Sequence, residues 1–322
     1  MNYLITGGAG FIGINFLEYM LENHKNDYFI VVDKMTYAAN VVHLYDLLNK
    51  HNNIVFYKDD ISKRKAINKI FCIEKPDIVI NFAAETHVDR SIKNPKPFIK
   101  TNVIGTNILL EISKKYSIKK YIQISTDEVY GPLTKEDLKN NKEFKPNDLL
   151  NPSNPYSATK ASADLLTLSY YKTYNLPIII IRMTNNFGPY QNKEKMIPKI
   201  ILNSLQKRKI PVYGDGTNKR DWLYVKDSVK AINFIIKKGE IGKIYHISTH
   251  NLLSNLELII LILNKLNIKS NLIQFIRDRS AHDYAYSLNT DDINKLGFML
   301  KNNFDKNIEE TIEFYKKNAK HI

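Results

Sequence analysis

Short apolar runs alternate with longer amphipathic segments through the first half of this 322-residue chain. Segments such as Asn15–Glu22 and Gly105–Tyr116 have apolar residues at helical spacing. The apolar runs predict buried strands at Tyr3–Thr6, Phe29–Val32, Ile54–Tyr57, Ile78–Phe82, Tyr121–Ser125 and Ile178–Arg182. Strands that alternate with helices build βαβ units. We therefore expect an α/β fold with a doubly wound parallel sheet that is covered on both faces.

A glycine-rich turn follows the first predicted strand. Gly8–Gly13 fits the pattern G-x-G-x-x-G and opens a predicted helix, whose N-terminal N–H groups would face a pyrophosphate. Asp33 ends the second strand, where a carboxylate accepts hydrogen bonds from ribose hydroxyls and repels a 2′-phosphate. These features predict a Rossmann-like domain that binds NAD rather than NADP. The alternative for Asp33 is a helix cap.

Two further strand ends would face the same cofactor. Asp60 and Ile61 follow the third strand, where the adenine ring would lie, although Asp60 can also be a plain strand-ending residue. Phe82–Ala84 ends the fourth strand with small residues, which leave room for a cofactor to cross the edge of the sheet.

The alternation loosens after Arg182. Asn185–Tyr190 and Val212–Gly216 read as loops, and the earlier segment Pro132–Pro155, which is polar, charged and punctuated by prolines, reads as a surface excursion between a strand and a helix. We predict that residues 1–184 form the NAD-binding Rossmann domain, with a returning segment at about 214–243. A smaller α/β lobe towards the C-terminus, made of residues 185–213 and 244–322, would bind the substrate.

Composition excludes several classes of protein. The net charge of +14 comes mostly from scattered lysines, which indicates a solvated surface with at most a mild attraction for a polyphosphate, and no clustered patch for nucleic acid. No apolar run is long enough to cross a membrane, and the N-terminus does not resemble a signal peptide. Cys72 is the only cysteine, so we expect no intrachain disulfide, a buried Cys72 and a cytoplasmic protein.

Tyr156 and Lys160 stand four residues apart on a predicted helix, so both side chains lie on one face. A lysine ammonium near a phenol favours the phenolate and lowers the phenol pKa. The phenolate can then take the proton of a substrate hydroxyl while hydride leaves the same carbon. By itself the Tyr-x-x-x-Lys pattern is common, but here it follows the Ser125-Thr126 strand end of an NAD-type domain.

Asp127 and Glu128 come directly after that strand end. They would face the crevice in which open α/β sheets bind ligands. Two adjacent carboxyl groups do not ionise equally, so one protonated acid and one carboxylate base are expected. That pair is equipped to remove a proton and to expel water. The alternative is a solvent-exposed strand end with two acids.

The chain resembles the dTDP-glucose 4,6-dehydratase family of the extended short-chain dehydrogenase/reductase superfamily. The resemblance runs nearly end to end, and the acidic pair is its most specific part. It rests on the stretches TGGAGFIG, DKMTYAAN, FAAETHVDRSI, ISTDEVYG, NPYSATKASAD, NNFGPYQNKEKMIPKII, PVYGDGTNKRDWLYVKD and DRSAHD. Two departures stand out: Ala39 replaces a glycine that is frequent in the family, and DRSAH replaces the more usual DRPGH.

The resemblance implies a role for each catalytic residue. Tyr156, assisted by Lys160 and Thr126, takes the proton of the 4-hydroxyl of the sugar while NAD⁺ takes hydride from C4. Glu128 then removes the C5 proton, and Asp127 protonates the departing 6-hydroxyl. Hydride then returns to C6 and C5 is reprotonated, which regenerates NAD⁺ in place and leaves a nucleotide-linked 4-keto-6-deoxyglucose.

The resemblance also implies two sets of binding residues, and we assign no metal ligands. The cofactor set is Gly7, Gly10, Phe11, Ile12, Gly13, Asp33, Lys34, Met35, Thr36, Asp60, Ile61, Phe82, Ala83, Ala84, Glu85, Thr101, Tyr156, Lys160 and Asn186. The nucleotide-sugar set is Thr86, Thr126, Asn185, Lys195, Met196, Pro211, Val212, Tyr213, Arg220, Asn251, Asp278, Arg279, Ser280, Ala281 and His282. The Arg220 guanidinium independently suits a diphosphate, although it could instead form a surface ion pair.

Three alternatives remain at this point. The same reaction on UDP-glucose is one, because Lys237–Gly242 is similar to UDP-glucose 4,6-dehydratases. A nucleotide-sugar 4-epimerase or decarboxylase on the same fold is the second, but it needs no acidic pair. A non-catalytic NAD-binding scaffold is the third, but it would not need Thr126, Tyr156 and Lys160 together. By resemblance we expect a homodimer joined through the helix that carries Tyr156 and its neighbour, and no nucleic acid or membrane partner.

Overall fold

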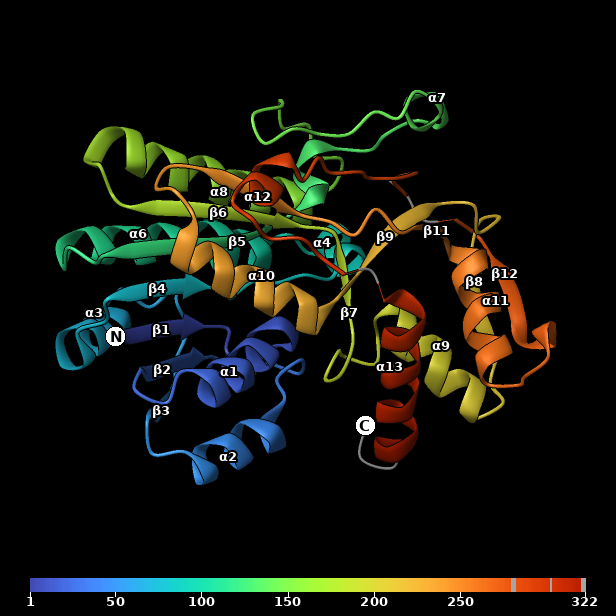
Figure 1. The fold of residues 1–322 in the computed structure, drawn as a ribbon, viewed down its shortest axis with the longest axis horizontal. Helices are drawn as coiled ribbons and strands as arrows, with labels where there is room; N and C mark the ends of the chain where they lie inside the picture. Colours follow the sequence, from blue (N-terminus) through green and yellow to red (C-terminus); the bar gives the residue numbers. More distant parts are fainter. Residues whose placement is uncertain (279–281, 302, 320–322) are drawn as a thin grey trace.

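The computed structural model describes residues 1–278, 282–301 and 303–319. Its larger part is a seven-stranded, all-parallel sheet, and its smaller part lies beyond the carboxyl ends of these strands (Figure 1). The strand order is β10-β6-β5-β4-β1-β2-β3. The strands are β1 (Asn2–Thr6), β2 (Tyr28–Asp33), β3 (Ile54–Lys58), β4 (Ile78–Asn81), β5 (Lys120–Thr126), β6 (Ile178–Met183) and β10 (Ile244–Ile247).

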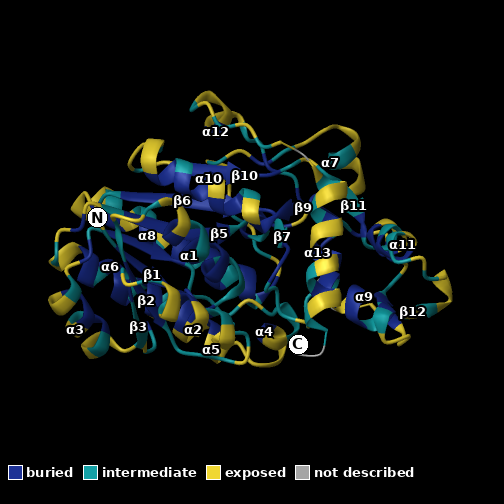
Figure 2. Cartoon of the chain, turned by 60° about the horizontal axis from the view of Figure 1, so that its bottom comes forward, coloured by how far each residue is buried: buried dark blue, intermediate teal, exposed yellow. Residues whose placement is uncertain are grey.

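Each strand contributes to two separate cores, because successive side chains point to opposite faces of the sheet. In β1, Tyr3 and Ile5 face one core and Leu4 faces the other. This double burial explains why the strands read as unbroken apolar runs rather than as an alternating pattern. Figure 2 shows the strands buried within the layers of helices, whose outer faces are exposed.

Helices cover both faces of the sheet. On one face lie α1 (Phe11–Asn23), α2 (Val41–Lys50), α10 (Val225–Lys238) and α12 (Asp291–Lys295). On the other lie α3 (Arg64–Glu74), α6 (Thr106–Lys115) and α8 (Pro155–Tyr174). The short elements are α4 (Val88–Lys93), α5 (Lys96–Phe98), the π-helical segment η1 (Ile99–Gly105), the 3₁₀ turn η2 (Asp127–Tyr130) and α7 (Lys135–Lys139). The doubly wound α/β prediction is therefore confirmed.

The smaller lobe has its own core, in which Trp222 lies with residues of three helices that are far apart in the sequence. Its three-stranded sheet has the order β11-β9-β7, and a second sheet pairs β12 with β8. The strands are β7 (Asn185–Phe187), β8 (Ile210–Tyr213), β9 (Lys219–Tyr224), β11 (Leu252–Ser254) and β12 (Ile273–Ile276). The helices are α9 (Met196–Leu205), α11 (Asn255–Lys265), α13 (Phe304–Asn318) and the 3₁₀ turn η3 (Ser270–Leu272).

Several boundaries differ from the sequence-based expectations. Strand β10 pairs with β6 at the edge of the large sheet, so the segment that returns to this sheet extends past residue 243. Strand β9, near the start of that segment, belongs instead to the three-stranded sheet. Parts of the two predicted loops after residue 184 are the strands β7 and β8. These strands are only three and four residues long, and partners distant in sequence stabilise them.

Two further expectations need correction. Cys72 is exposed, because it follows the buried Phe71 on α3 and therefore points away from the sheet. The excursion 132–155 does run over the surface, but Leu133 and Phe144 are buried where they bridge to Ala285 and Leu288. Within the described residues, no helix is long and apolar enough to cross a membrane.

Candidate active site

A cavity of about 310 Å³ opens at the carboxyl ends of the large-sheet strands. It lies where the chain turns to opposite sides of the sheet after β1 and after β4, which are neighbours. Ligands bind at this switch point in open α/β sheets. The walls come from the turn after β1, the ends of β2 to β6, the start of α8 and the segment after β7.

The glycine-rich turn forms a cradle that side chains would fill. Gly7 has φ +67°, and a Cβ there would lie 2.6 Å from the backbone nitrogen of Ala83. A Cβ on Gly13 would lie 2.3 Å from the carbonyl oxygen of Gly7. The turn leads into α1, whose N-terminus borders the cavity. Such a cradle fits the pyrophosphate of a dinucleotide.

Asp33 and Lys34 at the end of β2 continue this wall. The Asp33 carboxylate accepts hydrogen bonds from the backbone N–H groups of Ala9 (3.1 Å) and Met35 (2.8 Å), so it is locked onto the glycine-rich turn. Burial raises its pKa above the usual value. The Lys34 ammonium donates to Glu85 (2.6 Å) and to the Thr101 hydroxyl (3.1 Å).

The structure brings most of the predicted cofactor residues into this one cavity. Only Met35 and Glu85 of that set do not line it, and Glu85 holds Lys34, which does. From the predicted substrate set, Thr86, Thr126, Asn185 and Lys195 line the same cavity. The cofactor residues in its wall are Gly7, Gly10, Phe11, Ile12, Gly13, Asp33, Lys34, Thr36, Asp60, Ile61, Phe82, Ala83, Ala84, Thr101, Tyr156, Lys160 and Asn186.

Other lining residues did not emerge from the sequence. Gln191, Asn192 and Glu194 come from the segment after β7, inside a stretch that carried the family resemblance but was assigned only in part. Met183 and Thr184 follow directly from the position of β6, since the carboxyl end of a parallel strand faces the crevice. Asp59 stands beside Asp60 and could have been found in the same way.

The two acids occupy different environments on η2. This turn begins after Thr126, whose hydroxyl accepts a hydrogen bond from the Glu128 N–H (3.3 Å) and donates one to the Asp127 carboxyl (3.0 Å). Asp127 is buried, and among the described residues its second oxygen has no hydrogen-bond partner. Burial, with the nearby Glu128, raises the pKa of Asp127 to about 8. Asp127 is therefore a carboxylic acid at neutral pH.

Helix α8 presents Tyr156 and Lys160 from its first two turns. Asn154 caps the helix by accepting a hydrogen bond from the Ser157 N–H (3.0 Å), and Pro155 occupies the first helical position. Both Tyr156 and Lys160 are buried and line the cavity together with the acidic pair. The arrangement predicted from their spacing on one helix face is therefore present.

Groups other than Lys160 dominate the pKa of Tyr156 in the structure. Burial, then Glu128 and Asp127, raises the pKa of Tyr156, while the Thr126 hydroxyl acts in the opposite direction. The Lys160 ammonium instead donates to the carbonyl oxygen of Ile124 (2.6 Å), and burial lowers the pKa of Lys160 to about 8. Burial, and next the Glu128 carboxylate, therefore disfavour the phenolate form of Tyr156.

A second group of predicted residues belongs to the smaller lobe. The His282 ring contacts the Tyr213 ring edge to face, with centroids 6.0 Å apart, and its Nδ1 lies 2.6 Å from Asp278. Arg220 donates to the carbonyl oxygens of Asp283 (3.0 Å) and Tyr284 (3.2 Å), and it also lowers the Asp127 pKa. The remaining members are Met196 at the start of α9, Pro211 and Val212 on β8, and Asn251 before β11. Arg279, Ser280 and Ala281 lie outside the described residues.

Comparison with known proteins identifies the family. The model of the GDP-mannose 4,6 dehydratase family matches residues 4–311. The chain belongs to this family. Similar to it are the low-salt glycan biosynthesis protein Agl12 of Haloferax volcanii (42% identity, 98% of both chains) and dTDP-glucose 4,6-dehydratase 1 of Escherichia coli (40% identity, 100% of this chain and 94% of the relative).

A solved member of the family shares the whole fold. The crystal structure of dTDP-glucose 4,6-dehydratase from Bacillus anthracis, in complex with NAD, superimposes with a TM-score of 0.91. It is 40% identical and covers 100% of this chain and 98% of its own. The Rossmann-like architecture expected from the sequence is thereby confirmed. Membership of the GDP-mannose 4,6 dehydratase family also agrees with a cavity that joins a dinucleotide cradle to a pair of acids.

Proposed function

We propose that this protein is a dTDP-glucose 4,6-dehydratase, a hydro-lyase that converts dTDP-glucose into dTDP-4-keto-6-deoxyglucose. The observation that carries this proposal is Asp127, a buried carboxylic acid with its pKa raised to about 8, in one cavity with Glu128, Tyr156 and Lys160. Relatives that are about 40% identical over nearly the whole chain have the same activity in their names.

The cofactor is NAD, which fits the glycine cradle and the Asp33 carboxylate. When bound there it would supply the hydride chemistry, accepting hydride from C4 of the sugar and returning it to C6. The large sheet with its returning segment is the cofactor domain, and the smaller lobe holds the nucleotide sugar. Within that lobe, Arg220 is already fixed by backbone carbonyls before any diphosphate arrives.

The protein side chains handle the protons. Tyr156 must be the phenolate to take the proton of the 4-hydroxyl; burial disfavours that form, and the positive charge of bound NAD⁺ would favour it. The 4-ketone then acidifies the C5 hydrogen, which Glu128 removes. Asp127 gives its proton to the departing 6-hydroxyl, so that water rather than hydroxide leaves. A sugar 4-epimerase on this fold would have no use for that buried proton donor.

The test is a redox-neutral dehydration. Purified protein is incubated with dTDP-glucose, and the 4-keto sugar is followed by its alkaline absorbance and by the mass of the lost water. We expect a ketone without added oxidant, and a lower rate with UDP-glucose and CDP-glucose at equal concentration. Absence of a ketone from all three substrates would refute the proposal, and a preference for UDP-glucose would correct the nucleotide.

We further propose that the protein acts in the cytoplasm as a homodimer with nucleotide sugars as its only partners. The single cysteine supports a reducing compartment. Exposed apolar side chains on η1 and α8, among them Ile104 and Leu165, support a dimer through the helices on that face.

A further inference from the structure

A row of buried polar side chains crosses the large sheet directly beneath the cavity. Ser125 on β5 pairs in register with Arg182 on β6, which pairs with His246 on β10. Arg182 and His246 are each 1% exposed. The middle of a doubly covered parallel sheet is normally apolar, and a buried guanidinium is costly unless it is fully paired. Apolar packing therefore does not explain why these polar side chains are buried here.

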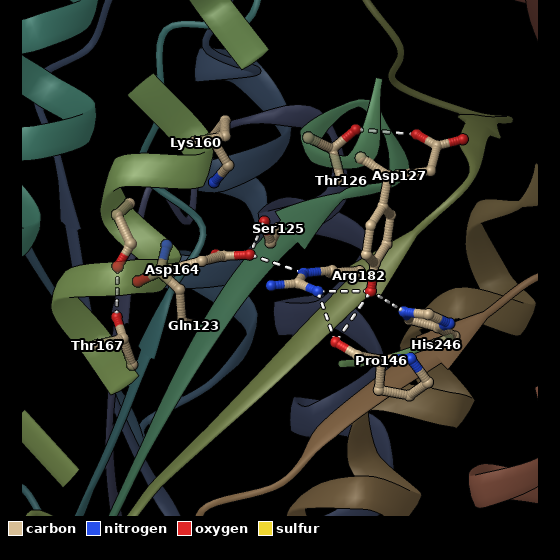
Figure 3. Close-up of polar contacts among 12 residues, drawn as sticks. Gln123, Ser125, Thr126, Asp127, Pro146, Lys160, Asp164, Thr167, Arg182 and His246 are labelled. Carbon is tan, nitrogen blue, oxygen red and sulfur yellow. Dashed lines mark hydrogen bonds and ion pairs between the residues drawn. The ribbon is translucent and has the colours of Figure 1, made fainter. Parts of the chain in front are cut away.

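Arg182 connects two elements that carry the chemistry. Its Nε donates to the Asp164 carboxylate on α8 (2.8 Å), and its Nη1 donates to the Tyr130 phenol oxygen at the end of η2. The same Nη1 also donates to the carbonyl oxygen of Pro146 (3.0 Å). Figure 3 shows the guanidinium held between Asp164 on one side and Pro146 and His246 on the other.

The hydrogen-bond directions at His246 follow from its two partners, and the Tyr130 hydroxyl also lies 3.2 Å from the carbonyl oxygen of Pro146, a second acceptor. His246 Nδ1 lies 2.9 Å from the carbonyl oxygen of Asn289, so this nitrogen carries the hydrogen. His246 Nε2 is then the acceptor, and the Tyr130 hydroxyl donates to it (2.7 Å). Burial, and then the Arg182 charge, lower the pKa of His246 to about 3, which keeps the ring neutral. The Tyr130 oxygen can then accept a hydrogen bond from Arg182 Nη1.

Both ends of the network lie next to catalytic groups. Asp164 stands one helical turn after Lys160 on α8, and it also accepts a hydrogen bond from the Ser125 hydroxyl (2.9 Å), one residue before Thr126. Tyr130 is the last residue of η2, the turn that begins with Asp127 and Glu128. Arg182 thus bridges the helix that carries the base and the turn that carries the acids, without touching the cavity itself.

We propose that Arg182 is a positioning residue that sets the spacing between the Tyr156 base on α8 and the acidic pair on η2. Oxidation at C4 and loss of water across C5 and C6 must act on one sugar without its release, so the two sets of groups must keep a constant separation. Displacing a catalytic group by about 1 Å can cost roughly 10²-fold in rate. This inference rests on the proposed dehydratase activity.

The first test removes one hydroxyl from the bridge. Tyr130→Phe loses the contacts of the hydroxyl to Arg182, His246 and Pro146 but keeps the ring, which stacks on Phe144. We expect a kcat about tenfold lower with an unchanged KM, together with NADH absorbance that builds up during turnover, because loosening η2 slows elimination more than oxidation. The matched control is Tyr170→Phe, which removes the hydroxyl that donates to Asn107 (3.1 Å) elsewhere on α8. The control should show neither change.

The second test keeps the positive charge at residue 182 but removes the guanidinium, which donates from two nitrogens at once. Arg182→Lys can reach one partner but cannot bridge Asp164 and Tyr130 in the same way, so its kcat should fall at least as far as that of Tyr130→Phe. The inference is overturned if Tyr130→Phe has wild-type kcat per folded molecule and accumulates no NADH, even where its melting temperature is lower. Wild-type protein that makes no 4-keto sugar would instead refute the proposed function, and this inference with it.

Discussion

At the scale of single residues, Asp127 has the chemistry that depends most strongly on its surroundings. Burial and Glu128 raise its pKa from 3.8 to about 8, so the fraction of molecules that hold the proton falls as the pH rises through about 8. The rate of elimination should therefore decline as the pH rises through about 8. Asp127→Asn should lower kcat by roughly 10²- to 10⁴-fold, the usual contribution of a general acid. Both effects are measured from the initial rates of ketone formation between pH 6 and 9.

The same residue links pH to stability. Between pH 3.8 and about 8 the folded protein holds a proton on Asp127 that the unfolded chain has lost. The contribution of Asp127 to the free energy of unfolding therefore falls as the pH rises through this window. Asp127→Asn should lose that part of the pH dependence, as seen in urea unfolding curves at pH 6 and pH 8.5. Equal slopes of stability against pH in both proteins would contradict the assignment.

Glu128 is separable from Asp127 because the two act on different protons. Glu128→Gln retains size and hydrogen bonding but cannot take the C5 proton. In a single turnover we expect NADH to form at close to the wild-type rate, while the loss of water slows by at least about 10²-fold. Stopped-flow absorbance and quenched samples measure the two steps on one preparation. A Glu128→Gln protein that dehydrates normally would assign the C5 proton to another group.

Sequence alone identified the residue types of the site but not their energetic balance. Asp33, Tyr156, Lys160 and the acidic pair follow from motifs at strand ends, and all of them line one cavity. The hydrogen bond from the Lys160 ammonium to the carbonyl oxygen of Ile124 was not predicted, because this partner is a backbone group. No sequence pattern encodes such a group or the depth of burial that raises the Asp127 pKa.

At the scale of elements, the turn between β1 and α1 has the strictest steric requirement. A Cβ at residue 13 would meet the Gly7 carbonyl oxygen at 2.3 Å, and backbone atoms cannot yield cheaply. Gly13→Ala should therefore cost about 1–3 kcal/mol in the free energy of unfolding and reduce the NAD bound to the purified protein. Thermal unfolding and the absorbance of released cofactor measure the two effects. For comparison, a Cβ at Gly297 would have no heavy atom within 4 Å but would sit on a backbone with φ +96°, so Gly297→Ala reports backbone strain without the steric clash.

The large-sheet strands were predictable because burial on both faces leaves continuous apolar runs. The runs at β1 to β6 could not belong to half-exposed strands, which would alternate. Strands β7, β8 and β10 were not predicted because none is a continuous apolar run: β7 begins with two asparagines, β8 contains Pro211, and His246 interrupts β10. Their existence depends on partners such as β9, β12 and β6, brought together by the tertiary fold.

At the scale of the whole molecule, the outer surface of the α6 and α8 layer predicts self-association. These helices pack on each other and on η1, and they expose Leu165 (56%) and Ile104 (49%) on the side away from the sheet. Burying apolar surface of this kind favours dimers. We expect the wild-type protein to have twice the mass of one chain in light scattering coupled to gel filtration at micromolar concentration.

Leu165→Glu tests that surface because a dimer would have to bury two unpaired carboxylates. We expect the dissociation constant of the dimer to rise at least about tenfold, which is about 1.4 kcal/mol. The monomer should keep its circular dichroism spectrum. Leu149→Glu is the matched control, since Leu149 is 90% exposed in the excursion 132–155, outside those helices. Because α8 also carries Tyr156 and Lys160, a weakened dimer should lose activity on dilution faster than wild type. A Leu165→Glu protein that stays dimeric at every concentration would place the interface on another surface.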